Sequence, residues 1–134
     1  MHTVMRTLVM VGTVLWLLSL AYASKGTATF YNPPYVPSAC YGYKDNGVNV
    51  AAVTNFFRVD KRSFFCGSLI WVKCIGGTNL LAPNPCTSSS VLVRVVDNCP
   101  TCQSTINLSK HAFSTIADPN AGKIKILMKF HVFA

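Results

Sequence analysis

Six cysteines, all of them downstream of an apolar N-terminal segment, constrain this chain more than any other feature of its sequence. They are Cys40, Cys66, Cys74, Cys86, Cys99 and Cys102. An even number of cysteines behind a secretion signal predicts three disulfides, formed in an oxidising compartment. Many pairings are possible, and spacing alone does not choose among them. We therefore predict a disulfide-stapled fold whose pairing this pattern leaves open.

The N-terminal segment, residues 1–23, has the three parts of a secretory signal peptide. Arg6 supplies the positive charge, residues 8–20 are almost entirely apolar, and Ala-Tyr-Ala at 21–23 provides small residues before the cleavage point. The apolar run of about 13 residues falls short of the roughly 20 that a membrane-spanning helix needs. We therefore predict cleavage, secretion, and an extracellular mature chain that does not span a membrane.

The mature residues, 24–134, amount to one domain, and their charge is strongly positive. Without Arg6, eleven Lys and Arg stand against four Asp and no Glu. This balance favours anionic surroundings such as pectic polymers, acidic membranes or nucleic acid. The basic residues are scattered, however, with only Lys61-Arg62 adjacent, whereas a nucleic-acid face needs clustering. We expect no nucleic-acid partner and a monomeric domain.

Strand patterns dominate the mature chain. Residues 27–31, 69–74 and 91–96 are β-branched or apolar runs of strand length. Residues 123–133 alternate, with Ile, Met, Phe and Val on one face and Lys and His on the other, as in a half-buried strand. The count comes to about six strands and predicts a mainly all-β domain, a β-barrel rather than a helical bundle.

Turns and one helix complete this prediction. Residues 45–47 and 76–77 have turn composition, because Asp, Asn and Gly accept a positive φ most readily. Ser109 can cap a helix whose inward stripe includes Phe113. Asp-Pro at 118–119 ends that helix, since the residue before proline avoids the α region.

The motif Cys99-Pro100-Thr101-Cys102 is compatible with a redox pair, half of a zinc site or a structural disulfide. A redox pair gains thiolate character from a helix that starts directly behind it, whereas here loop and strand residues follow. A zinc site needs a second closely spaced pair of ligands, which the other four cysteines do not offer. The sequence favours the structural disulfide, and we predict no metal and no cofactor.

Only four carboxylates are available for acid–base chemistry. Asp45 and Asp118 belong to turn and helix-end signals, and Asp60 lies in a polar, charged stretch. Asp97, at the end of an apolar strand, is placed either for function or for accepting hydrogen bonds from loop amides. Since hydrolysis of a glycoside needs two carboxyl groups, we predict no catalytic residues and no enzymatic activity.

Asn107-Leu108-Ser109 is an N-glycosylation sequon, so Asn107 is a candidate glycan site. Alternatively, Asn107 simply ends a strand before the helix cap. His111 and His131 are isolated and are expected on the surface of the helix and of the last strand.

Several motifs occur in a familiar order: GTATFY at 26–31, ACYG at 39–42, CG at 66–67, VRVVDNCP at 93–100 and INLS at 106–109. Together they resemble the first domain of expansins, which is related to family-45 endoglucanases. PPYVPSACY at 33–41 and IADPNAG at 116–122 resemble the plant natriuretic peptides, which are secreted, stand-alone members of the expansin-like family. The resemblance covers essentially all of residues 24–134.

This resemblance implies a six-stranded double-psi β-barrel with one short helix. It also implies the disulfides Cys40–Cys66, Cys74–Cys86 and Cys99–Cys102. Thr29, Tyr31 and Asp97 match positions of the expansin groove, where polysaccharide binds.

Two departures from the expansin pattern bear on catalysis. Asn107 stands where the family has a second acid in the groove, and residues 35–39 lack the acid that expansins carry before the first cysteine. An amide cannot donate a proton as a carboxylic acid does. We expect no second, polysaccharide-binding domain. We also expect no hydrolysis.

The resemblance to natriuretic peptides implies a secreted signal in the apoplast that affects water and solute balance through a cell-surface receptor. The candidate receptor contacts are Tyr35, Tyr41, Tyr43, Lys44, Phe56 and Arg58. Aromatic and basic side chains of this kind suit protein recognition. The alternatives are a cell-wall polysaccharide binder or loosener without hydrolysis, using Thr29, Tyr31, Asp97 and Asn107, or a barwin-like defence protein.

Overall fold

The computed structural model describes residues 23–54, 58–59, 62–63 and 66–131. Within these ranges, no helix has the length and apolar character needed to cross a membrane. The predicted signal peptide lies outside them except for Ala23, as do Phe56, Asp60 and the last residues of the predicted C-terminal strand.

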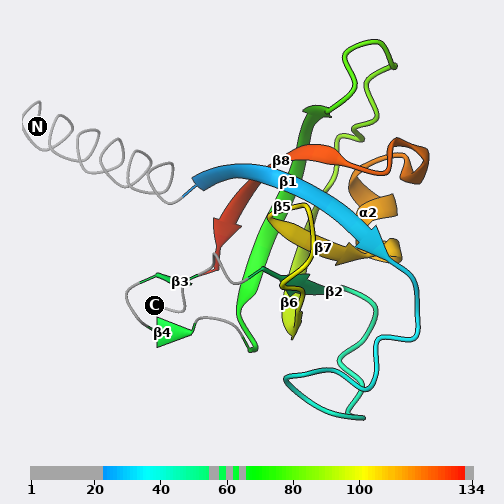
Figure 1. The fold of residues 1–134 in the computed structure, drawn as a ribbon. Coiled ribbons are helices and arrows are strands. Elements are labelled where there is room, and N and C mark those ends of the chain that lie inside the picture. The colour runs from blue at the N-terminus through cyan, green and yellow to red at the C-terminus, as the bar shows by residue number, and fades with distance from the viewer. Residues whose placement is uncertain (1–22, 55–57, 60–61, 64–65, 132–134) are drawn as a thin grey trace, which may run out of the picture.

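Six strands form a closed barrel in the order β1-β7-β2-β6-β5-β8 (Figure 1). Their bounds are β1 Ala23–Tyr31, β2 Val50–Val53, β5 Leu69–Gly77, β6 Ser90–Asn98, β7 Ile106–Ser109 and β8 Ile124–Phe130. Two pairs, β1 with β7 and β2 with β6, are parallel, and the other pairs are antiparallel. The described residues also contain a short antiparallel pair, β3 (Arg58–Val59) with β4 (Arg62–Ser63). This architecture confirms the predicted six-stranded, mainly β barrel.

Alternation along the strands sorts side chains between the barrel interior and its outer surface. In β8, Ile124, Ile126 and Met128 are buried, while Lys125 and Lys129 are exposed, as the sequence pattern predicts. β5 and β6 alternate in the same way. Because each residue points to the face opposite its neighbour's, one row of apolar side chains per strand fills the interior.

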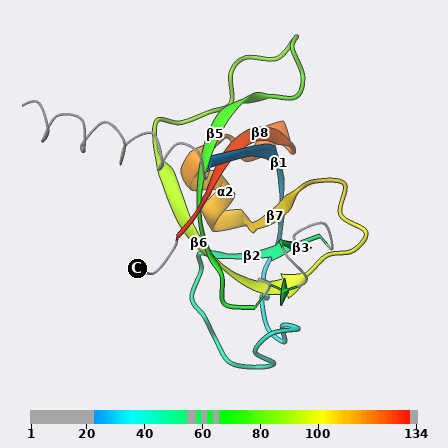
Figure 2. The same cartoon turned by 90° about the vertical axis from the view of Figure 1, so that its left-hand side faces the viewer.

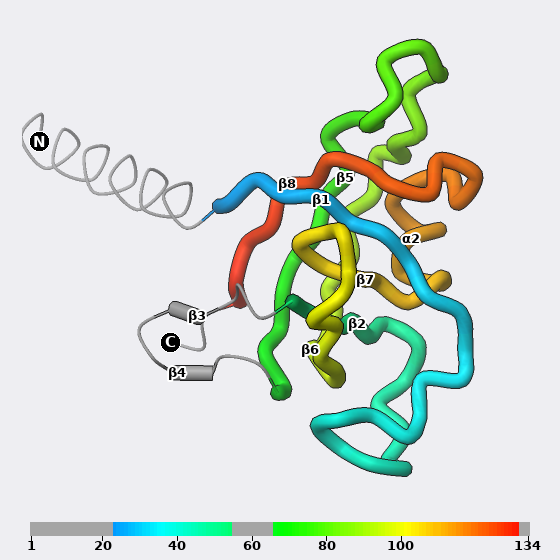
Figure 3. The backbone as a smooth tube through the Cα atoms, in the orientation of Figure 1, coloured from blue at the N-terminus to red at the C-terminus, as the bar shows by residue number. Residues whose placement is uncertain are grey.

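The predicted helix is α2 (Lys110–Ile116), which contacts β6, β1 and β7 and closes off part of the barrel (Figure 3). Phe113 is fully buried, with its ring centroid 4.9 Å from that of Phe30. Asp118 then caps a short 3-10 turn, η1 (Pro119–Ala121), by accepting a hydrogen bond from the Asn120 amide.

Two details of the prediction were wrong. Gly76 and Gly77 do not form a turn but continue β5, where a register shift between Cys74 and Gly76 marks a bulge. Glycine is common at such bulges, which explains the misleading signal. In addition, β1 begins at Ala23 rather than Thr27, since its first residues pair with β8.

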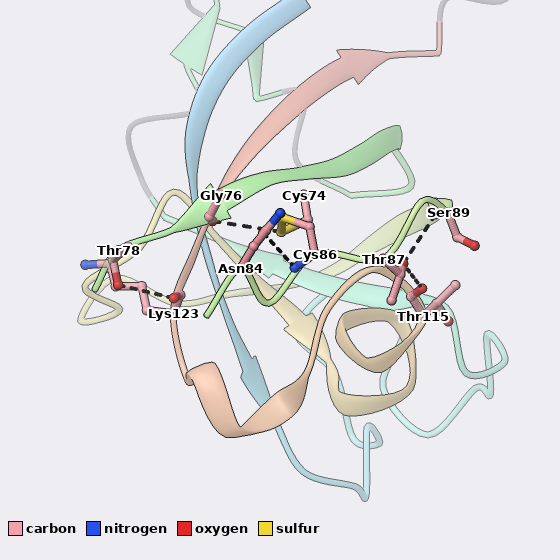
Figure 4. Close-up of a disulfide and its surroundings, with 9 residues drawn as sticks. All are labelled: Cys74, Gly76, Thr78, Asn84, Cys86, Thr87, Ser89, Thr115 and Lys123. Atoms are coloured by element: carbon pink, nitrogen blue, oxygen red, sulfur yellow. Dashed lines mark hydrogen bonds between the residues drawn. A yellow bond between two sulfur atoms is a disulfide. The ribbon is translucent and has the colours of Figure 1, made fainter. Parts of the chain in front are cut away.

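The three disulfides join the pairs that the expansin resemblance implies: Cys40–Cys66, Cys74–Cys86 and Cys99–Cys102. Cys74–Cys86 closes the base of the β5–β6 connection (Figure 4). Thr78 Oγ1 donates a hydrogen bond to the Lys123 carbonyl and Thr87 Oγ1 to the Thr115 carbonyl, which ties this connection to the segments around β8 and α2. In two perpendicular views, this loop and the loop of residues 32–49 extend from opposite ends of the barrel (Figure 2).

Ser109 joins β7, α2 and the loop before β2. Its fully buried hydroxyl accepts a hydrogen bond from the Ala112 amide, as the N-cap of α2, and donates one of 2.6 Å to the Val48 carbonyl. A single side chain thus satisfies one otherwise unpaired helix amide and one loop carbonyl.

Replacing Ser109 by Ala is expected to lower the free energy of unfolding by about 1–2 kcal/mol, because both hydrogen bonds are lost. Urea unfolding measures this. The protein should come from a host that does not N-glycosylate, since the substitution also removes the sequon. Ser114→Ala, at an exposed position of the same helix, should change stability by less than about 0.5 kcal/mol. Equal effects in the two variants would contradict this role.

Candidate functional site

Strand register brings three of the four predicted groove residues into one row across four strands. Thr29 of β1 lies beside Asn107 of β7, Asn107 beside Ala52 of β2, and Ala52 beside Asp97 of β6. The chain neighbours of Thr29, Ala52 and Asn107, such as Ala28, Ala51 and Ile106, belong to the core, so the row faces the outer surface. We call Thr29, Asn107, Ala52 and Asp97 the polar row.

A bulge in β6 turns Asp97 toward this face. Val95 pairs with Ala51 and points into the core, whereas the next pairing joins Ala52 to Asp97 and leaves Val96 as the extra residue. In a regular strand, Asp97 would share the face of Val95 and point into the apolar interior. The extra residue therefore places the carboxylate outside the core, an effect typical of bulges near binding sites.

Asp97 also holds the loop of residues 38–42 in place. Its Oδ1 accepts hydrogen bonds from the amides of Ala39, at 3.3 Å, and of Asn98, at 2.9 Å. The Cys40 amide donates to the Val96 carbonyl, and Cys40 is anchored by its disulfide to Cys66. The structural interpretation of Asp97 as an acceptor for loop amides thus has direct support, in addition to its place in the polar row.

Tyr31, next after Thr29 on the outer face of β1, contributes a buried hydroxyl. This hydroxyl has no hydrogen-bond partner among the described residues. Burial, with smaller contributions from the charges of Asp97 and Tyr35, raises the pKa of the Tyr31 phenol to about 12. The phenol therefore remains a neutral O–H donor throughout the physiological range.

Tyr35 holds Tyr31 in place. The two rings meet edge to face with centroids 4.9 Å apart. The Tyr35 hydroxyl donates to the Tyr31 carbonyl at 3.1 Å and accepts from the Lys110 amide at 3.0 Å. Tyr35, a candidate receptor contact, thus links β1 to the start of α2.

The other end of the row is a hydroxyl–amide network. Thr29 Oγ1 donates to Asn107 Oδ1 at 3.0 Å and lies 2.7 Å from Ser104 Oγ. Ser104 is buried and donates to the Ile106 carbonyl. Sequence reasoning missed Ser104, because a lone serine in a loop after Cys102 carries no recognisable signal. Asn107 keeps its partly exposed side chain in this network, and its glycosylation stays a prediction.

The remaining receptor candidates lie on the 32–49 loop or follow it in the chain. Tyr43 is 83% exposed, and Lys44 Nζ lies 5.8 Å from the centroid of the partly buried Tyr41 ring. Only the backbone of Arg58 is described, and Phe56 lies outside the described ranges. The structure therefore groups Tyr41, Tyr43 and Lys44 on the 32–49 loop, which the polar row contacts through the hydrogen bond between Asp97 and the Ala39 amide.

A surface depression of about 610 Å³ lies between this loop and α2. Its lining includes Tyr35, Val36, Asp45, Lys110 and His111. The sequence analysis did not predict it, since its two walls are far apart in the chain. In the part of the chain that the structure describes, no group of three or more His, Cys, Asp or Glu side chains could hold a metal ion.

A closed six-stranded barrel with three disulfides and an outer polar row defines an expansin-like, disulfide-stapled β-barrel protein. The family model described as lytic transglycolase, a double-psi β-barrel family, matches residues 49–128 and confirms the predicted double-psi fold. The chain is 57% identical over 109 residues to an EG45-like domain containing protein of Citrus jambhiri, covering 81% of this chain and 82% of that protein. It belongs to the EG45-like domain proteins.

Further comparisons agree on family and fold. Putative EG45-like domain containing protein 1 of Arabidopsis thaliana is 44% identical over 123 residues, which cover 90% of this chain and 95% of that one. A mutant of Clavibacter michiganensis expansin, solved in complex with cellohexaose, superposes with a TM-score of 0.62 at 24% identity over 82% of this chain. The chain spans 50% of that expansin. Streptomyces papain inhibitor superposes with a TM-score of 0.57 at 23% identity over 82% of this chain and 94% of that one.

A spectrophotometric titration of tyrosinate should show one late step near pH 12, because burial opposes ionisation of Tyr31. Since the folded pKa lies above the ordinary value of 10.0 for a tyrosine, the stability contributed by the neutral phenol is complete below pH 10 and is lost as the pH rises toward 12. Tyr31→Phe should remove only the late step. A titration curve that Tyr31→Phe leaves unchanged near pH 12 would contradict the buried environment.

Proposed function

We propose that this protein is secreted to the apoplast and binds a β-linked wall glucan along the polar row and Tyr31 without cleaving it. The observation that carries this proposal is the buried Tyr31 hydroxyl without a partner in the described part of the chain. An unsatisfied buried hydroxyl costs about 1–3 kcal/mol, which a hydroxyl-rich ligand can recover if its binding turns the Tyr31 side chain so that the shielded hydroxyl reaches a sugar oxygen. Burial and the Asp97 charge both raise the Tyr31 pKa, and this keeps the phenol able to donate to a sugar oxygen.

The row offers the groups that sugar hydroxyls need. Thr29, Asn107 and Asp97 present a hydroxyl, an amide and a carboxylate on one face, and the Tyr31–Tyr35 pair adds aromatic surface beside them. The expansin that shares this fold was solved with cellohexaose, which supports a glucan as the ligand class.

Hydrolysis is not part of the proposal, because the row contains one carboxylate. Inverting and retaining glycosidases both need a pair of carboxyl groups that flank the bond. Here Asn107 occupies the row together with Asp97. Asp45 and Asp118 each accept a hydrogen bond from an amide of their own turn, and Asp60 lies outside the described residues.

The test is calorimetric titration of the secreted, disulfide-bonded protein with cellohexaose. Tyr31→Phe should weaken binding about three- to tenfold, because one hydrogen bond to the ligand is lost. The same variant should unfold at an equal or higher temperature, since it also removes an unsatisfied buried group. Tyr43→Phe, at an exposed position, is the matched control and should bind as the parent does.

Two results would contradict the proposal. One is unchanged affinity in Tyr31→Phe. The other is release of reducing ends from a glucan that Asp97→Asn abolishes, which would make the protein a hydrolase.

A second candidate function is that of a plant natriuretic peptide-like systemic signal in water and solute homeostasis. The observation that favours it is the exposed Tyr43 on the 32–49 loop, next to Lys44 and its ring contact with Tyr41. Tyrosine is enriched among the residues that contribute most to binding at protein interfaces. A barwin-like defence role has no comparable support among the described contacts.

Wall-free plant protoplasts distinguish the two functions, because they lack the polymer. The oxidised protein should change protoplast volume at low dose if it signals, and Tyr43→Ser should reduce the effect while Tyr31→Phe should not. Reduced protein serves as the control. Absence of any volume change would refute the signalling role and leave glucan binding untouched.

A further inference from the structure

Four lysines surround one leucine on the outer face of the barrel. Lys73 of β5 and Lys25 of β1 lie beside Leu127 of β8 on either side, in antiparallel register. Lys125 and Lys129 lie two residues before and after it on the same strand, and all four lysines are exposed. Neighbouring strands are about 5 Å apart and i, i+2 positions about 7 Å, so the four ammonium groups share one small surface. We call these four residues the lysine ring.

The ring has no acidic neighbour on its own strands. β1, β5 and β8 contain neither Asp nor Glu, and the chain as a whole contains no Glu. Asp97 belongs to β6, which is not a strand of the ring, and takes part in the polar row at the end of that strand. Clustered like charges repel one another at a cost to stability. A dense anionic partner would offset this repulsion.

The ring and the polar row are centred on different strands of the barrel and share only β1, which carries Lys25 and Thr29. In the closed order of strands, β5 lies three places from β7, and β8 three places from β2. The polar row runs across β1, β7, β2 and β6, whereas the ring is centred on β8.

An indole completes the surface. Trp71 is 40% exposed on the outer face of β5, beside Lys129 of β8 and Leu92 of β6. It is two residues from Lys73 on the same face. A flat aromatic ring can stack on the apolar face of a sugar ring, while ammonium groups at this spacing pair with carboxylates on either side.

We infer that the lysine ring and Trp71 form a second binding surface, whose ligand is a carboxylated polysaccharide. The protein then holds an acidic polymer through the ring and a neutral glucan through the polar row. This inference is independent of the glucan site, because it rests on other residues and another ligand.

A lipid surface fits these residues less well. Peripheral membrane binding buries an apolar face by several ångströms, in addition to its attraction for anionic headgroups. In this sheet face, Leu127 is already half-buried and is encircled by charges, so little apolar area is left to insert. The regular spacing of cations around a stacking surface suits a repeating polyanion.

The experiment measures binding of the secreted, disulfide-bonded protein to de-esterified polygalacturonate at about 50 mM NaCl. The double variant Lys25→Gln with Lys73→Gln should bind at least about tenfold more weakly. The control, Lys44→Gln with Lys110→Gln, removes the same charge elsewhere and should change binding less than about twofold. Thermal unfolding of each variant checks that its fold is intact.

Three further arms make the test decisive. Fully methyl-esterified polygalacturonate should bind poorly, because its carboxylates are neutral. Trp71→Ala should weaken binding even at about 200 mM NaCl, where the ionic contribution is largely lost. The ring variant should bind cellohexaose as the parent does, which separates this result from the glucan site.

Equal losses in the ring and control variants would show that net charge alone attracts the polymer, and would overturn the inference. Binding to vesicles that contain phosphatidylserine, without binding to polygalacturonate, would also overturn it.

Discussion

Strand β8 is hydrogen-bonded to β1 on one side and to β5 on the other, and this double pairing closes the barrel. Closure leaves no free sheet edge among the six strands and fixes which face of each strand is inside. The apolar residues of β5, β6 and β8 meet in the enclosed interior, where Phe113 of α2 joins them. The residues of the polar row and of the lysine ring then lie on the outer surface at positions set by register.

Local patterns were enough to predict much of this fold. A few consecutive residues were enough to predict the alternation in β8, the apolar run of β6 and the helix cap at Ser109. Strand periodicity and helix capping depend only on residues that are close together in sequence. β2 was missed because its sequence, Val-Ala-Ala-Val, is wholly buried and does not alternate. The closing pairs depend on contacts between distant segments, which no short window of sequence encodes. The disulfide pairing came from family resemblance and not from spacing.

The candidate site was predictable only in part, for the same reason. Resemblance singled out Thr29, Tyr31, Asp97 and Asn107, and the register brings Thr29, Asn107 and Asp97 into one row. The burial of the Tyr31 hydroxyl and the close approach of Thr29 to Ser104 arise from packing between distant segments, so they became visible only in three dimensions. The lysine ring is a similar case: its members range from Lys25 to Lys129 and are scattered in sequence.

The bulge at Val96 makes the length of β6 matter more than its composition. Another apolar side chain at this position would preserve the arrangement, because Val96 contributes one residue of backbone and a buried contact. Deleting Val96 would shift the register by one residue, so each later side chain of the strand would point to the opposite face. Asp97 would then face the hydrocarbon interior. Evolution of this surface can therefore proceed freely by exchange of side chains, but a deletion in β6 would be tolerated only with a compensating insertion nearby.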